Sequence, residues 1–224
     1  MKPLDVAELR LVNHTKPEKK PSLKQFKEKE MEATQQAIKV VALSGSLRKA
    51  SFNRGLIRAA IDLTKERVKG MEIEYVDISP LPMLNTDLEV AGTYPPVVEA
   101  FRQKILQADC YLFASPEYNY SVTGPLKNAI DWASREPNVW ADKAAAIVSA
   151  GGEFGGGRAQ YHLRQIGVYL DLHFINKPEF FLNAFEPPEK FDSDGNLIDK
   201  QAKENLKQIL LALKAFTLRL KANY

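Results

Sequence analysis

The sequence contains very little cysteine and no long apolar run. Its single cysteine, Cys110, cannot form an internal disulfide or a thiolate metal site by itself, and such usage is typical of a reducing compartment. No apolar run approaches the roughly 18–20 residues that a membrane span needs, and no apolar signal core stands near the N-terminus. We therefore expect a cytoplasmic protein with no membrane span.

A strong excess of charge of one sign is also missing. The formal net charge is +3, from 31 Lys and Arg against 28 Asp and Glu. Residues 1–37 hold eight of the basic and six of the acidic residues, which leaves 23 against 22 for residues 38–224. This balance gives no reason to expect nucleic acid or an anionic membrane as a partner. We expect 1–37 to be a charged, disordered extension and 38–224 to form one domain.

Apolar runs alternate with helical patterns from residue 38 onwards. Strands are predicted at Ile38–Ser44, Met71–Ile78, Asp109–Ser115 and Lys143–Ala150, with a short fifth strand within Leu172–Leu182. Helices are predicted at Asn53–Lys69, Val97–Gln107, Gly124–Ser134 and Arg158–Leu170, and a last one carries Ala202 to Leu220 on one face. This alternation predicts an α/β fold: a doubly wound, five-stranded parallel sheet with helices on both faces.

The turn after the first strand has the composition of a phosphate site. Ser46, Arg48, Ser51 and Asn53 can together bind several phosphate oxygens, and the following helix N-terminus favours an anion. The turn contains neither Gly-x-Gly-x-x-Gly nor Gly-Lys-Ser/Thr, so a monophosphate fits better than a pyrophosphate or a triphosphate. The alternative is an ordinary helix cap, in which Ser51 or Asn53 only satisfies helix N–H groups.

Two later turns should meet the first one, because ligands of such sheets bind beyond the carboxyl ends of the strands. Ser115–Pro125 offers two tyrosines, an asparagine and a rigid proline, which suit a planar heterocycle. Ser149–Arg158 contains five glycines, which let backbone approach a ligand closely. A solvent-facing tyrosine loop and a flexible loop without ligand are the alternatives.

Three motifs, in this order along the chain, resemble the NADPH-dependent FMN reductase family of flavodoxin-like proteins. They are Gly45–Asn53, Pro116–Ser121 and Gly124–Trp132. Within the family, the likeness is greatest to the plant NAD(P)H:quinone oxidoreductases and the bacterial chromate and quinone reductases. The resemblance covers residues 38–224. It implies a flavodoxin-like fold with strand order 2-1-3-4-5 and FMN bound where the strand order reverses.

The resemblance also implies which residues bind FMN. Ser46, Arg48, Ser51 and Asn53 would hold the phosphate, with Leu47 and Phe52 in the same loop. Pro116, Glu117, Tyr118, Asn119 and Tyr120 would lie along the flavin ring, which Ser149, Gly151 and Gly152 would approach from the fourth strand.

The implied activity is a two-electron, ping-pong transfer of hydride from NADPH or NADH through FMN to a quinone or another small acceptor, in a homodimer or homotetramer. No side chain is expected to act as catalytic acid, base or nucleophile. No metal site is expected, because His162 and His173 have no ligand spacing to a partner. A broad FMN, azo or chromate reductase is one alternative. A flavodoxin-like electron carrier is another, disfavoured because such a carrier usually has a strongly acidic docking face.

Overall fold

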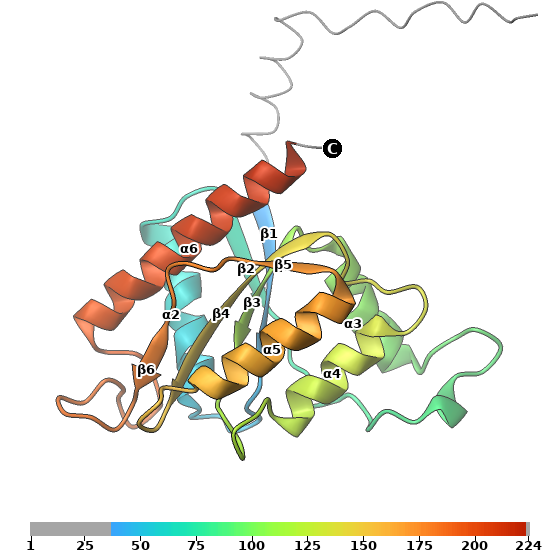
Figure 1. Cartoon of the computed structure of the whole chain (residues 1–224), viewed down its shortest axis with the longest axis horizontal. Helices are drawn as coiled ribbons and strands as arrows, with labels where there is room; N and C mark the ends of the chain where they lie inside the picture. Colours follow the sequence, from blue (N-terminus) through green and yellow to red (C-terminus); the bar gives the residue numbers. More distant parts are fainter. Residues whose placement is uncertain (1–36, 223–224) are drawn as a thin grey trace, which may run out of the picture. The chain divides into compact units, whose positions relative to one another are not determined.

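The computed structural model of the protein describes residues 37–222, so the predicted extension lies outside the described residues except for Ala37. Five parallel strands follow the apolar runs: β1 (Ile38–Ser44), β2 (Met71–Tyr75), β3 (Cys110–Ala114), β4 (Lys143–Gly151) and β5 (Leu172–Phe174). Their order in the sheet is β2-β1-β3-β4-β5, which confirms the predicted order (Figure 1).

Five α-helices and one short 3-10 helix connect and cover these strands. They are α2 (Phe52–Glu66), η1 (Thr86–Leu88), α3 (Pro96–Gln107), α4 (Gly124–Ser134), α5 (Gly157–Leu170) and α6 (Lys200–Lys221). Helices α2 and α6 lie on one face of the sheet, and α3, α4 and α5 lie on the other (Figure 1). Successive residues of β1 therefore enter different cores: Val40 packs on the α2 and α6 side and Val41 on the other.

The structure differs from the predicted elements at two strands. The region predicted to hold one short strand contains two, β5 and β6 (Phe181–Asn183), and both pair with β4. Strand β4 has nine residues and extends beyond β5. Strand β5 therefore pairs only with the start of β4, and β6 pairs with its end. Strand β2 ends at Tyr75, three residues earlier than predicted, since the Asp77 carboxylate binds the Ser79 N–H and turns the chain.

The core encloses both tryptophans and the cysteine. The indole N–H of Trp132 donates to the Pro82 carbonyl at 2.8 Å, and that of Trp140 donates to the Ile130 carbonyl at 3.1 Å. Burial raises the pKa of the Cys110 thiol to about 12, so this thiol stays protonated near neutral pH. Between residues 37 and 222, no helix is both long and apolar enough to cross a bilayer.

Candidate functional site

A cavity of about 450 Å³ lies beyond the carboxyl ends of β1, β3 and β4. This volume is within the range of ligand pockets, which is roughly 300–1,000 Å³. All three polar turns line the cavity: Ser46, Arg48, Ser51, Phe52 and Asn53 come from the first, Pro116, Glu117 and Tyr118 from the second, and Gly151 and Gly152 from the third. The structure therefore brings together ten of the fourteen candidate residues.

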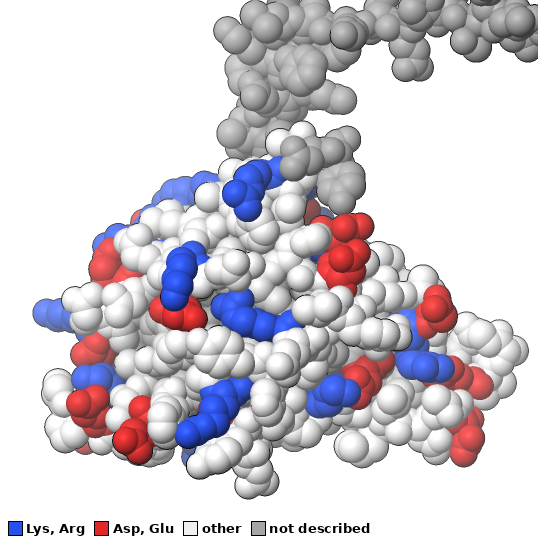
Figure 2. All heavy atoms as spheres, viewed as in Figure 1, with Lys and Arg blue, Asp and Glu red and all other residues white. Residues whose placement is uncertain are grey.

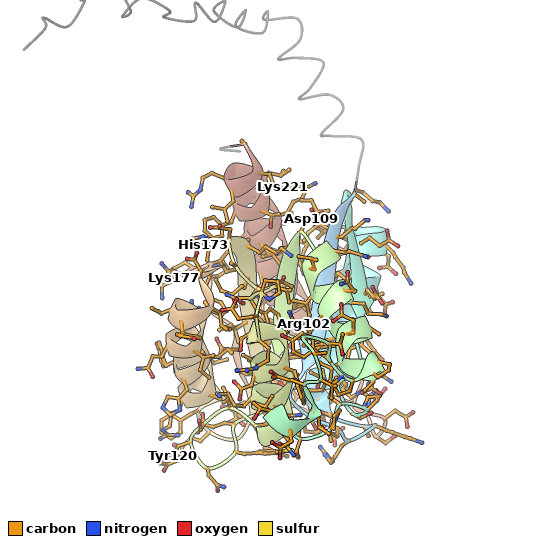
Figure 3. The ribbon with its side chains drawn as sticks, turned by 90° about the vertical axis from the view of Figure 1, so that its right-hand side faces the viewer. Arg102, Asp109, Tyr120, His173, Lys177 and Lys221 are labelled. Atoms are coloured by element: carbon orange, nitrogen blue, oxygen red, sulfur yellow. The ribbon has the colours of Figure 1, made fainter. Side chains whose placement is uncertain are left out.

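The other four candidates lie beside the cavity and do not line it. Leu47 is exposed next to Arg48. Asn119 and Tyr120 form the tip of a tight turn with positive φ angles of 50° and 63°, closed by paired hydrogen bonds between Tyr118 and Ser121. The Tyr120 side chain is 65% exposed, and its ring lies against the Arg158 guanidinium at the rim of the cavity; Figure 3 shows Tyr120 at the end of the sheet where the cavity lies. Ser149 is buried, and its hydroxyl donates to the Gly155 carbonyl at 2.5 Å.

Six lining residues were not among the candidates: Ala150, Glu153, Phe154, Gly156, Arg158 and Phe185. Five of them belong to the glycine-rich turn or its edges, so the sequence indicated their segment but not their side chains. Phe185 comes after β6, a strand that the sequence pattern did not separate from β5. Only the pairing of β6 with the end of β4 brings Phe185 to the cavity.

The first turn leaves the start of α2 available to a ligand. Ser51 is the N-cap residue, yet within the described part of the chain its side chain forms no capping hydrogen bond. No acidic residue stands in the first turn of α2. An uncapped helix N-terminus with a hydroxyl and Arg48 beside it is a favourable site for an anion. This geometry does not support the alternative in which Ser51 serves only as a helix cap.

The Asn53 side chain, which lines the cavity, is also hydrogen-bonded within the protein. Its amide donates to the Ala150 carbonyl at 2.8 Å and accepts from the Ala150 N–H at 3.0 Å. The pairing of β3 with β4 ends at Ala114 and Val148, so Ala150 of β4 has no paired β3 residue. The Asn53 amide forms the hydrogen bonds with Ala150 that a neighbouring strand would otherwise form. The side chain of Asn53 thus joins α2 to β4 through one amide N–H and the amide oxygen, and its second amide N–H and its backbone N–H remain for a ligand.

Glu117 connects the second and third turns. Its carboxylate accepts from the Arg158 backbone N–H at 2.9 Å and from the Arg158 guanidinium at 3.1 Å. A carboxylate is stabilised at this place because it lies at the N-terminus of α5. The Arg158 guanidinium also lies between two rings, with its Cζ 3.9 Å from the Tyr120 ring centroid and 3.7 Å from that of Phe154. The charge of Glu117 is therefore neutralised within the site.

One further group of possible metal ligands occurs within residues 37–222, at the other end of the strands. Asp142, Asp171 and His173 each offer an atom within 4.8 Å of the others, and His173 Nε2 lies 3.5 Å from Asp142 Oδ1. Figure 3 shows His173 and Tyr120 at opposite ends of the sheet. The sequence did not predict this group, because Asp142 and His173 are 31 residues apart. The group is remote from the cavity.

Comparison with known proteins gives relatives that span most of this chain. NADPH:quinone oxidoreductase of Arabidopsis thaliana is 78% identical over 183 residues, which are 82% of this chain and 93% of that protein. Quinone reductase of Escherichia coli K12 is 42% identical over 188 residues, 82% of this chain and 97% of that protein.

A solved structure is also similar to the chain, namely FerB of Paracoccus denitrificans, a flavoenzyme NAD(P)H:(acceptor) oxidoreductase. It matches with a TM-score of 0.69 and 30% identity, and the match covers 83% of this chain and 98% of FerB. The family described as NADPH-dependent FMN reductase matches residues 38–187, a span that includes the three turns of the cavity. The chain belongs to the NADPH-dependent FMN reductase family.

Proposed function

We propose that the protein is a cytoplasmic NAD(P)H:quinone oxidoreductase that binds FMN in the cavity. The observation that carries the proposal is the composition of this cavity. An uncapped helix N-terminus and Arg48 stand beside Pro116, Tyr118 and glycine backbone. FMN has a single anionic group and a flat ring, which a ribityl chain joins. The name of the Arabidopsis thaliana relative, at 78% identity, supports the choice of quinone as acceptor.

In this proposal the first turn holds the FMN phosphate. Ser46, Arg48 and Ser51 supply side-chain donors, and Asn53 supplies its backbone N–H at the start of α2. Leu47 and Phe52 belong to the same loop. Arg48 is the charged member of the set, and its guanidinium has no ion-pair partner among residues 37–222, so it is available to the phosphate.

The second and third turns hold the ring. Pro116 and Tyr118 line the cavity from one side, and Gly151 and Gly152 present backbone from the other. Glu117 fixes these turns to each other through Arg158, while Ser149 fixes the glycine-rich turn through Gly155. Asn119 and Tyr120 stand at the rim. Bound FMN would supply two-electron redox chemistry between NADPH or NADH and the quinone, so the protein's part would be to bind and orient these reactants.

Anaerobic mixing with a nicotinamide coenzyme tests the proposal. Purified holoprotein is expected to be yellow, to lose the absorbance of oxidised flavin on addition of NADPH or NADH, and to regain it on addition of a quinone. The measurement is a visible spectrum recorded before and after each addition. A flavin that stays oxidised for minutes with both coenzymes would rule out the reductase.

A broader reductase is the second candidate. The NAD(P)H-dependent FMN reductase PA1204 of Pseudomonas aeruginosa is 49% identical over 186 residues, so free FMN is a reasonable alternative acceptor. Steady-state rates with a quinone, free FMN, chromate and an azo dye distinguish the two. An electron carrier is less consistent with the surface, because Lys, Arg, Asp and Glu are interspersed on the face that carries α5 and α6 (Figure 2).

The proposal includes a homodimer or homotetramer with α5 at the interface. Tyr161 and Val168 lie two turns apart on one side of α5, Tyr169 is adjacent to Val168, and the three are 54%, 82% and 85% exposed. A row of exposed apolar side chains on one helix is typical of an interaction surface.

Val168→Glu is therefore expected to lower the oligomer mass, because a carboxylate would have to be desolvated in the interface. Sedimentation equilibrium measures this. Val90→Glu is the control, since Val90 is also exposed, at 65%, but lies outside α5. An unchanged mass for Val168→Glu would exclude α5 from the interface.

A further inference from the structure

The segment 184–199, which joins β6 to α6, packs on the first turn of the cavity. Most of this segment lies beyond residue 187, where the match to the family ends. It nevertheless reaches the loop that precedes α2 and the first two turns of α2 itself. Its contacts therefore bear on the site proposed to hold the FMN phosphate.

The segment has a fixed conformation of its own. The Asp192 carboxylate accepts from the Asn196 N–H at 2.7 Å and from the Asp194 N–H at 3.0 Å, and these hydrogen bonds lower the pKa of Asp192. The side-chain amide of Asn196 donates to the same carboxylate at 3.0 Å. Phe191 and Leu197 pair across the turn and are both buried. The turn is thus ordered by its own hydrogen bonds and by two apolar anchors.

Two glycines let the segment touch the first turn backbone to backbone. A Cβ at Gly55 would collide with the Gly195 carbonyl oxygen, and a Cβ at Gly195 would lie 2.5 Å from the Ala50 carbonyl oxygen. Gly195 also has a φ of +74°, which glycine adopts without strain. Neither position can accept a side chain without moving Ala50 or α2. The segment therefore fixes the distance between the loop before α2 and the body of the protein.

Side chains reinforce this contact. Arg58 on α2 donates through Nε to Asn196 Oδ1 at 2.7 Å and through a terminal nitrogen to the Asp194 carbonyl at 3.1 Å. Phe52, the first residue of α2, stacks on Phe191 with ring centroids 4.4 Å apart. Phe185 also packs against Phe52, with ring centroids 5.8 Å apart, and it lines the cavity.

We propose that segment 184–199 is part of the FMN site and sets its affinity. It holds the loop before α2 and the α2 N-terminus in the geometry that binds the phosphate, and it adds Phe185 as a direct ligand contact. Arg58 acts as a positioning residue, because it touches the segment and not the cavity. A site that is already ordered loses less conformational freedom on binding, so its affinity is higher. This inference rests on the proposed FMN site.

Arg58→Ala tests the inference, with Arg67→Ala as a matched control. Arg67 lies just past the other end of α2 and pairs with Glu204 of α6 at 2.8 Å, so it also links α2 to the C-terminal part of the chain, but far from the cavity. We expect Arg58→Ala to weaken FMN binding about tenfold, the effect of losing hydrogen bonds worth roughly 1.4 kcal/mol. Arg67→Ala should stay within about twofold of the natural protein. Serial dilution of each holoprotein, read by the fluorescence of released FMN, gives the dissociation constants.

Further variants separate positioning from a general loss of stability. Arg58→Lys should recover part of the affinity, because its ammonium can still donate to one of the two acceptors. Asn196→Ala removes the partner instead of Arg58 and should weaken binding to a similar extent. Equal FMN affinity of Arg58→Ala and Arg67→Ala, at matched melting temperatures, would overturn the inference. Failure of the natural protein itself to bind FMN would instead overturn the proposed function.

Discussion

Arg48→Ala is expected to weaken FMN binding by roughly 10- to 100-fold and to leave the protein folded. A hydrogen bond to a charged group contributes about 1.5–3 kcal/mol, and this range corresponds to that loss of affinity. Arg48 is exposed at the cavity and has no ion-pair partner among the described residues, so its removal breaks no structural contact of its side chain. Fluorescence of released FMN measures the affinity, and circular dichroism checks the fold.

Lys49→Ala is the control for this variant. Lys49 carries the same charge, is exposed and is the next residue in the chain, but it is not part of the cavity lining. A general electrostatic effect of the loop would weaken binding in both variants equally, whereas a specific contact predicts a loss for Arg48 alone. Full flavin retention by Arg48→Ala would exclude the phosphate from the first turn.

The sequence predicted the sheet well because the signal for it is local. Residues 38–44 are apolar almost without interruption, which is expected only when a strand is covered on both faces, and in the structure β1 supplies both cores. The polar turns were recognised because each directly follows such a strand. Since parallel strands bring their carboxyl ends to one edge, the meeting of the three turns followed from topology alone.

The missed features all depend on partners that are distant in the sequence. Arg58 and Asn196 are 138 residues apart, and no local pattern joins them. Phe185 reaches the cavity only because a second short strand, β6, pairs with the end of β4. Glu117 lines the cavity, and its carboxylate is also bound to Arg158 of α5, a pairing that the sequence does not reveal.

Asn53 is the position where stability and ligand binding meet, so Asn53→Ala is expected to affect both. Removing the amide leaves the N–H and C=O of Ala150 unpaired in a site where both residues are 2% exposed. Each of the two unpaired buried groups costs roughly 1–3 kcal/mol, so we expect a loss of about 2–6 kcal/mol in the free energy of unfolding. For a chain of this size, that loss lowers the melting temperature by roughly 4–24 °C.

FMN affinity should fall in the same variant, because Asn53 lies in the first turn of α2 at the proposed phosphate site and Ala150 lines the cavity. Asn128→Ala is the matched control: its amide also binds backbone on both sides, accepting from the Leu84 N–H at 2.7 Å and donating to the Pro82 carbonyl at 2.8 Å, but away from the cavity. It should lose stability and keep FMN. If Asn53→Ala melts at the same temperature as the natural protein, the hydrogen bonds of the Asn53 amide to Ala150 do not stabilise β4 as a neighbouring strand would. If it melts earlier but binds FMN as tightly as Asn128→Ala does, the link between α2 and β4 stabilises the fold without shaping the flavin site.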